Sequence, residues 1–234
     1  MTLEQYLKIP NPIEKELYNI YNKESKIVIF EIGCCEGEDT IKYSRMFPNS
    51  KIYSFEPVPD NYQKTIENLH EYGVDNAQTF QIALSDNDSI IDFYLSEGHP
   101  FDIPKTNQWN YGNKSSSLLP PKELHERYDW LRLNKMIEVQ SSSLYTFCFE
   151  NNIPEIDLIH MDVQGAELLV LKGAKEYLNK VNMIWLEVET VELYKGQSLR
   201  DDVVDFLTTN GFIKIKEEES LFSGDILFIN KKII

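Results

Sequence analysis

Residues 26–57 read KIVIFEIGCCEGEDTIKYSRMFPNSKIYSFEP, and the order of patterns in this stretch indicates the fold. Residues 26–32 are rich in β-branched side chains and stop at Gly33, which is typical of a strand buried on both faces of a sheet. The pattern then predicts a short helix over residues 40–46 and a second strand over residues 50–55. A strand, a helix and a strand in this order favour parallel pairing through a right-handed crossover.

The same alternation continues toward the C-terminus. The next helix is expected to have Asp60 as its cap and to bury Tyr62, Ile66 and Leu69. Further strands are expected over residues 77–84, 90–95, 157–163 and 183–188, with a helix interrupted at Gly173 and another helix over 199–207. The runs FIKI and ILFI near the end predict a hairpin. The sequence therefore predicts a doubly wound α/β fold, a mostly parallel sheet with an antiparallel C-terminal strand.

Length and composition indicate one domain, residues 1–234, with some elaboration. The chain is 42% hydrophobic and 12% aromatic, which supplies enough apolar mass for a core. Residues 1–25 are expected to form an N-terminal helical extension. Residues 97–128 carry four prolines and three consecutive serines, so they break the alternation. We expect an inserted loop or lid there, and a loop without a specific role is the alternative.

The charge balance limits the kind of partner. Lys and Arg number 23 against 38 Asp and Glu, a net charge of −15, whereas binding to nucleic acid or to an anionic membrane needs a surplus of basic residues. No apolar leader and no run of about eighteen apolar residues is found, so no membrane span is predicted. Three cysteines, two of them adjacent, cannot build a disulfide framework, and we expect a cytoplasmic location.

Two features at the ends of the first two strands indicate a cofactor site. The turn from Glu31 to Gly37 has its glycines spaced G-x-x-x-G, which allows close approach of a ligand but departs from the G-x-G-x-x-G of dinucleotide sites. Glu56 ends the second strand, where an acidic side chain can accept both hydroxyls of an adenosine ribose. The alternatives are that the glycines serve only the turn and that Glu56 is a solvated strand-end acid.

A third feature follows the strand predicted at 157–163. Because strand side chains alternate, His160 and Asp162 are expected on the same face, at the carboxyl end where chemistry takes place in parallel sheets. Asp162 is alternatively a cap for the following helix, and His160 a hydrogen-bonded strand residue. Glu187 and Glu189 end the next strand and add carboxylates to the same cleft.

Taken in order, six segments resemble the FkbM family of S-adenosylmethionine-dependent methyltransferases. They are EIGCCEG, SFEPVPDN, IALSD, SSSLLP, DLIHMDVQGAELLVLKGA and IWLEVE, and they cover roughly residues 26–190. The resemblance implies the Rossmann-like fold of class I methyltransferases and S-adenosylmethionine as the cofactor.

Carried over residue by residue, the resemblance implies cofactor contacts in four groups. The turn residues lie under the methionine part of the cofactor, Glu56 and Pro57 hold the ribose, three residues after the third strand border the adenine, and Asp162 lies near the transferred methyl group. The full set is Glu31, Gly33, Cys35, Gly37, Thr40, Glu56, Pro57, Ala83, Leu84, Ser85 and Asp162. The chain departs from the family pattern at Glu31, at Cys34 and Cys35, at His160 and at Gln164, where the family usually has Asp, Ala-Asn, Lys and Glu.

The predicted reaction is transfer of a methyl group to a hydroxyl oxygen of a sugar or glycan precursor, a small-molecule or glycan acceptor. A hydroxyl needs a base, and the candidates are Asp162 and then His160, whose ordinary pKa of about 6.5 suits proton transfer near neutrality. Asp162, Glu167, Glu187 and Glu189 offer oxygens for Mg²⁺, but their spacing fits no ligand motif. No metal site is therefore predicted.

The inserted loop is the predicted acceptor site. His99, Trp109 and Tyr111 offer rings that stack on a sugar, and Asn107, Gln108 and Asn110 offer amides for its hydroxyls. Two other functions stay open at this point. One is a nicotinamide-dependent oxidoreductase, and the other is a non-catalytic binding module that keeps the fold, suggested by the departures at Cys35, His160 and Gln164.

Overall fold

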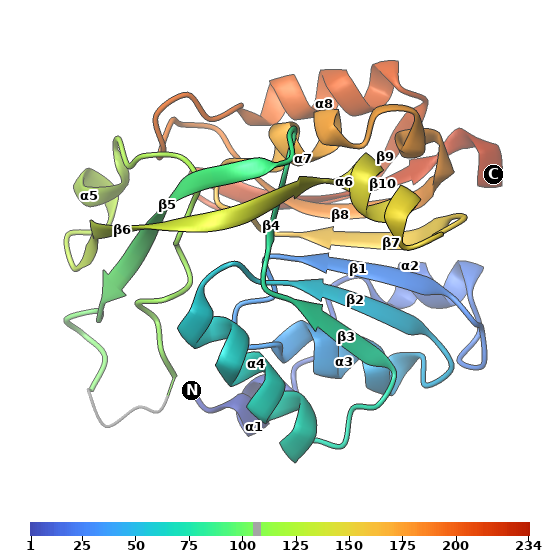
Figure 1. The fold of residues 1–234 in the computed structure, drawn as a ribbon, viewed down its shortest axis with the longest axis horizontal. Helices are drawn as coiled ribbons and strands as arrows, with labels where there is room; N and C mark the ends of the chain where they lie inside the picture. The colour runs from blue at the N-terminus through green and yellow to red at the C-terminus, as the bar shows by residue number, and fades with distance from the viewer. Residues whose placement is uncertain (105–108) are drawn as a thin grey trace.

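The apolar run at residues 26–32 forms β1 (Val28–Ile32), an inner strand of a seven-stranded sheet in the computed structural model, which describes residues 1–104 and 109–234 (Figure 1). The other strands are β2 (Lys51–Phe55), β3 (Ala77–Phe80), β4 (Ala83–Ser85), β5 (Ser89–Gly98), β6 (Leu131–Ser143), β7 (Ile156–Met161), β8 (Val181–Glu189), β9 (Phe212–Glu219) and β10 (Ser223–Asn230). The helices are α1 (Leu3–Tyr6), α2 (Glu14–Ile20), α3 (Glu38–Met46), α4 (Pro59–Glu71), α5 (Leu124–Arg127), α6 (Leu144–Glu150), α7 (Glu167–Gly173) and α8 (Arg200–Thr209), with 3-10 turns η1 (Lys175–Lys180) and η2 (Lys231–Ile233).

The main sheet has the strand order β3-β2-β1-β7-β8-β10-β9. β1 pairs in parallel with β2 on one side and with β7 on the other, and β8 continues in parallel beyond β7. β10 pairs antiparallel with β8 and with β9, so the predicted hairpin and the antiparallel C-terminal strand are confirmed. The strand order reverses at β1, and in such sheets ligands bind where the carboxyl ends of the two central strands diverge.

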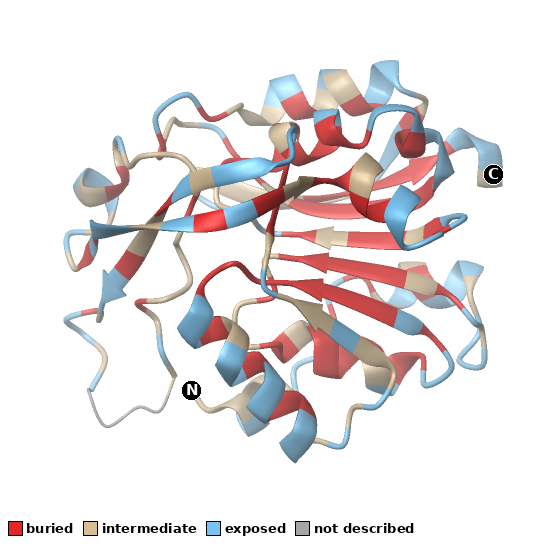
Figure 2. Cartoon of the chain, viewed as in Figure 1, coloured by how far each residue is buried: buried red, intermediate tan, exposed pale blue. Residues whose placement is uncertain are grey.

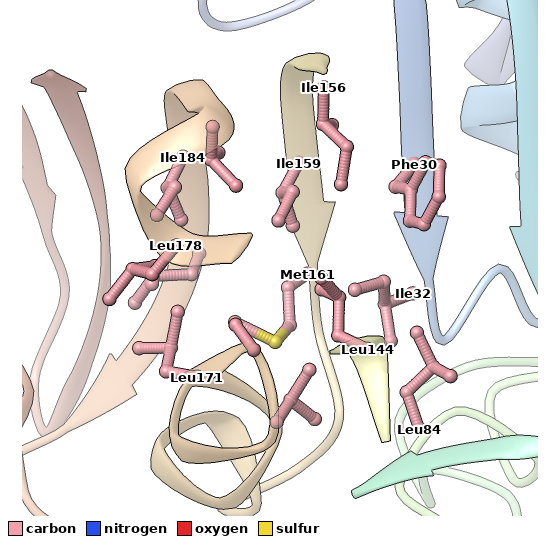
Figure 3. Close-up of a cluster of buried hydrophobic side chains, with 14 of the residues drawn as sticks. Phe30, Ile32, Leu84, Leu144, Ile156, Ile159, Met161, Leu171, Leu178 and Ile184 are labelled. Carbon is pink, nitrogen blue, oxygen red and sulfur yellow. The ribbon is translucent and has the colours of Figure 1, made fainter. Parts of the chain in front are cut away.

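Alternation along the strands sends side chains to both faces of the sheet. Phe30 and Ile32 pack with residues of α6, α7 and α8, and Figure 3 shows them beside Ile159, Met161 and Leu171. Ile29 lies in a second cluster with residues of α2 and α3 on the other face. Figure 2 shows the central strands buried along most of their length. The doubly wound fold is therefore confirmed, and its core explains why residues 26–32 are almost wholly apolar.

A second sheet of three strands, in the order β4-β6-β5, was not predicted. The strand expected over 77–84 is wrong as a single element, because the chain leaves the main sheet after β3 and its β4 part pairs with β6 instead. The sequence analysis did not predict β6, because the residues in the middle of this strand are largely polar and are exposed on both faces. With β5, which is longer than expected, it forms an arm that extends beyond the main sheet in Figure 1.

The predicted buried face of α4 is confirmed only at Leu69, which is 6% exposed, while Tyr62 is half-buried. Ile66 is 40% exposed, Asp60 is exposed in the first turn, and the N-cap is Val58 without a side-chain cap bond. The buried face is polar because it holds the turn after β1: Thr65 Oγ1 donates to the Cys35 carbonyl over 2.8 Å, and Asn68 Nδ2 to that of Glu36 over 2.8 Å. Among the described residues, no helix is long and apolar enough to cross a membrane.

Candidate functional site

A cavity of about 230 Å³ lies at the carboxyl ends of β1, β2 and β7. Its walls come from the turn after β1, from the segments around Glu56, Ala83 and Asp162, and from residues 109–118, which cross above it. Tyr6 of the N-terminal extension also reaches this cavity. The position is the one that a doubly wound sheet offers to a ligand.

The turn after β1 depends on glycine at Gly33. Its φ is +87°, and a Cβ atom there would lie 2.0 Å from the carbonyl oxygen of Asp162. Gly33 thus lets the ends of β1 and β7 approach closely, and it lines the cavity together with Cys35. Gly37, with φ +79°, is the N-cap of α3, faces Thr65 and does not line the cavity.

Glu56 lies at the end of β2 and is only 4% exposed. Its Oε2 accepts a hydrogen bond from the Cys35 backbone N–H over 2.9 Å, and its Oε1 accepts one from the Val58 backbone N–H over 2.8 Å. Burial raises the pKa of Glu56 to about 8, although these hydrogen bonds oppose the rise. Pro57, the next residue, also lines the cavity.

Of the three residues predicted to border adenine, Ala83 and Leu84 line the cavity. Ser85 is buried and lies outside it, against α7, where a Cβ added to Gly173 would lie 2.0 Å from the Ser85 carbonyl oxygen.

Glu31 lies at the floor of the cavity, close to two other ionisable side chains. Its Oε2 accepts a hydrogen bond from the Thr40 hydroxyl. Thr40 is fully buried, forms a second hydrogen bond of 2.8 Å with the Ser54 hydroxyl, and does not line the cavity. Burial raises the pKa of Glu31 well above its usual range, and Asp39 raises it further. Ligand atoms of Glu31, Asp39 and His160 lie within 4.8 Å of one another, so they are the group in the described part of the chain that could hold a metal ion.

His160 and Asp162 face the same cavity, as the alternation of β7 predicted. His160 packs edge-on against Tyr43 with ring centroids 5.7 Å apart; burial lowers its pKa, and its Nδ1 is buried without a hydrogen-bond partner in residues 1–104 and 109–234. Asp162 is exposed toward the cavity, and its Oδ1 accepts a bond from Gln164 Nε2 over 2.7 Å. The alternative role of Asp162 as a cap is wrong, because α7 has Ala166 as its N-cap.

Gln164 connects Asp162 to a second carboxylate. The same Nε2 also donates to Glu187 Oε2 over 2.8 Å, while its Oε1 accepts from the Tyr194 hydroxyl over 2.7 Å. The backbone of Gln164 is left-handed, with φ +54°, and its carbonyl accepts a bond from Ser117 over 2.8 Å. The amide therefore holds two carboxylates in fixed positions.

The segment above the cavity is anchored at several points. The Trp109 ring packs against that of Tyr6 with centroids 5.2 Å apart and a tilt of 35°, and Lys114 Nζ lies 4.4 Å from the Trp109 ring centroid. Lys114 forms an ion pair with Glu38. Burial lowers the pKa of Lys114, but the neighbouring Cys35 and Glu38 raise it by more, so the pKa of Lys114 lies above its usual value. Asn113 Nδ2 donates to Glu36 over 2.8 Å.

The predicted acceptor residues do not gather in one place. Trp109 lines the cavity, but His99 and Tyr111 do not: His99 Nε2 lies 2.9 Å from the Ile103 carbonyl, and Tyr111 packs edge-on at 5.8 Å from His99. Asn107 and Gln108 fall outside the described residues. Sequence reasoning missed Tyr6, Lys114 and Tyr194, because each reaches the site from a loop or extension with no motif of its own.

The cavity is strongly acidic. Glu31, Glu38, Asp39, Glu56 and Asp162 line it, against Lys114 as the single Lys or Arg among the lining residues described, and Lys114 is already paired with Glu38. Such a wall favours a cationic ligand and disfavours a pyrophosphate.

The comparisons with known proteins agree with this geometry. The sequence model described as "Methyltransferase FkbM domain" matches residues 31–214. The chain is 31% identical over 221 residues to the 2-O-methyltransferase NoeI of Sinorhizobium fredii, covering 94% of this chain and 86% of that protein. It is 25% identical over 148 residues to Methyltransferase 1 of Beauveria bassiana, covering 62% and 57%.

Two solved structures share the fold. One is TrmK of M. capricolum in complex with S-adenosylhomocysteine, with a TM-score of 0.51 at 9% identity over 95% of this chain and 69% of that one. The other is a precorrin-6y C5,15-methyltransferase from Geobacter metallireducens, with a TM-score of 0.50 at 11% identity over 96% and 91%. At such identities the likeness concerns the fold alone, which is that of class I methyltransferases.

Proposed function

The chain belongs to the FkbM methyltransferase family, and from that premise we propose that it methylates a hydroxyl oxygen of a sugar or glycan precursor. Membership of this family implies S-adenosylmethionine as the methyl donor. The choice of oxygen as acceptor is supported by the similarity to a protein named as a 2-O-methyltransferase. A single observation carries the donor half of the proposal: a buried carboxyl, Glu56, ends β2 inside an acidic cavity at the point where the strand order reverses.

The residues of the cavity fit this donor. S-adenosylmethionine supplies a methyl group bonded to a positively charged sulfur. When an oxygen attacks that methyl group, the sulfur leaves readily as a neutral thioether. Glu56 is placed to accept hydrogen bonds from the ribose hydroxyls, and Ala83 with Leu84 gives an apolar wall for the adenine. Glu31 and Asp39 offer carboxyl oxygens to the ammonium group.

Asp162 is the proposed general base. It is exposed to the cavity, and Gln164 fixes its Oδ1, so a hydroxyl delivered beside it can lose its proton as the new bond forms. Alignment of the acceptor oxygen provides the rest of the rate increase. His160 is the second candidate, because burial lowers its pKa and keeps it neutral, with a lone pair to accept a proton.

A nicotinamide-dependent oxidoreductase and a metal-dependent methyl transfer are less well supported. A nicotinamide dinucleotide would bring its pyrophosphate against five carboxylates. The carboxyls weighed as Mg²⁺ ligands in the sequence analysis, where no metal site was predicted, are Asp162, Glu167, Glu187 and Glu189. They do not form a group within ligand distance in the described residues, whereas Glu31, Asp39 and His160 do. Full turnover after EDTA treatment is the expected result if the base works without a metal.

The proposal is tested by calorimetry with S-adenosylmethionine and NADH, followed by transfer of a labelled methyl group to fractionated glycans. We expect heat with S-adenosylmethionine and none with NADH, and label in a glycan fraction. Absence of heat with S-adenosylmethionine refutes the donor. Binding without transfer to any fraction supports the non-catalytic module instead.

A further inference from the structure

A second cavity, of about 130 Å³, lies beside the first. Gln164 lines both cavities, and Ser115 lines the second while its neighbours Lys114 and Ser116 line the first. The second cavity therefore adjoins the place where Asp162 and the methyl donor are proposed to meet. Nothing in the proposed cofactor site uses it.

One wall of the second cavity is aromatic. Tyr128 and Trp130 line it, their ring centroids 6.2 Å apart at 70°, and Phe222 packs edge-on against Tyr128 at 5.8 Å. Both lining rings pack against the buried cluster of Leu124, Leu131 and Leu193. The rings are thereby held in place, and a supported aromatic ring is a ready surface for the C–H face of a sugar.

Two carboxyls also line the second cavity. Glu187 accepts from Gln164 over 2.8 Å, and Glu189 is 1% exposed with its Oε2 accepting from Gln197 over 3.0 Å. No Lys, Arg or His belongs to the described lining of this cavity. Burial raises the pKa of both carboxyls, to about 7 for Glu189. Once ionised, a carboxylate accepts hydrogen bonds only, so above neutral pH this wall suits hydroxyl donors and repels a phosphate or a carboxylate.

We propose that this second cavity is the acceptor subsite, and that it takes an uncharged sugar ring and rejects sugars that carry an acidic group. The sugar ring stacks on Trp130, and its hydroxyls donate hydrogen bonds to Glu187 and Glu189. Gln164 donates to both Glu187 and Asp162, so it connects this subsite to the proposed base. The inference rests on the proposed methyl transfer. It also moves acceptor recognition from His99 and Tyr111 to the segment that runs from α5 into β6.

The probes are the neutral methyl glycosides of glucose, galactose and mannose, each paired with its uronic acid counterpart. Release of S-adenosylhomocysteine measures transfer. At least one neutral glycoside is expected to be methylated with a kcat/KM 100-fold or more above that of its acidic counterpart. Equal or better transfer to the uronic acids overturns the proposal. If calorimetry shows S-adenosylmethionine bound but no glycoside is methylated, the subsite assignment fails while the donor assignment stands.

Variants locate the effect. Trp130→Ala is expected to raise KM for the neutral glycoside tenfold or more, with the dissociation constant of S-adenosylmethionine unchanged. Glu189→Gln keeps the shape but removes the charge, so the ratio of neutral to acidic transfer is expected to fall at least tenfold. Phe149→Ala, exposed on α6, is the control and should change neither quantity. An unchanged ratio in Glu189→Gln contradicts the electrostatic selection, and an unchanged KM in Trp130→Ala contradicts the stacking surface.

Discussion

Glu56 combines two roles at the scale of a single residue. Its oxygens fasten the turn after β1 and the start of α4 through backbone N–H groups, and the same carboxyl faces the proposed ribose position. A hydrogen bond to a charged group contributes about 1.5–3 kcal/mol. A change at Glu56 is therefore expected to alter both the conformation of the turn after β1 and the affinity for the donor.

Replacing Glu56 by Gln is expected to weaken binding of S-adenosylmethionine by about 10- to 100-fold, since ~1.4 kcal/mol corresponds to a factor of ten. Calorimetry measures this change. Glu67→Gln, on the exposed face of α4, is the matched control and should leave the affinity unaltered. A Glu56→Gln variant that folds and binds like the parent protein would remove this residue from the cofactor site.

Asp162→Asn is expected to reduce turnover by about 10²–10⁴-fold, the usual contribution of a general base, while the affinity for S-adenosylmethionine stays the same. The amide can keep its position between the neighbouring side chains but cannot take a proton. Single-turnover kinetics with a labelled donor measure the effect. If His160→Gln has the larger loss and Asp162→Asn little, the two candidates exchange roles.

At the scale of elements, Gly173 shows why a helix ends where it does. α7 meets β4 there so closely that no side chain fits between Gly173 and the Ser85 carbonyl. The sequence identified the glycine as an interruption but not its neighbour, because β4 belongs to a sheet that was not foreseen.

We expect Gly173→Ala to destabilise the fold by about 1–3 kcal/mol through overpacking against backbone. Lys172→Ala, one residue earlier and exposed, is the control and should stay within about 0.5 kcal/mol. Urea unfolding followed by circular dichroism gives both values. Equal midpoints for the two variants would mean that the contact can relax.

The elements that could be predicted share one property. β1, β2, β7 and β8 are buried on both faces, so their sequences are apolar runs that need no knowledge of partners. β6 is stabilised by its pairing with β4 and β5, which are distant in sequence, and its own residues are mostly polar. The same contrast holds in the site: Gly33, Glu56 and Asp162 follow strand ends, whereas Lys114 and Tyr194 arrive from loops whose paths only the folded chain determines.

At the scale of the whole molecule, the excess of carboxyl groups sets the response to pH. Burial raises the pKa of Glu56 to about 8 and those of Glu189 and Asp225 to about 7. Between about pH 4.5 and these values the folded chain holds protons that the unfolded chain has released. Stability contributed by these groups is therefore fully present at low pH and is lost as the pH rises through 7 and 8.

The melting temperature is accordingly expected to fall from pH 5.5 to pH 8.5, and Glu56→Gln should reduce the slope. Hydrogen bonds lower the pKa values of three other carboxyls, Asp88, Glu192 and Glu217, and their opposite effect appears only in more acidic solution. Differential scanning fluorimetry at constant ionic strength measures the trend. A melting temperature that rises over this interval would contradict the assignment of buried, partly protonated carboxyls.

The short stretch from Asn113 to Ser117 is fixed at both ends: Asn113 and Lys114 bond the turn after β1, while the Ser115 carbonyl and the Ser117 hydroxyl bond Tyr194 and Gln164. Lys114 and Ser116 line the first cavity, and Ser115 between them lines the second. A ligand that shifts the stretch on one side must therefore alter the free energy of occupancy on the other. Under the proposed assignment of the two cavities, we expect donor and acceptor binding to be thermodynamically linked, so that each changes the affinity of the other by the same factor.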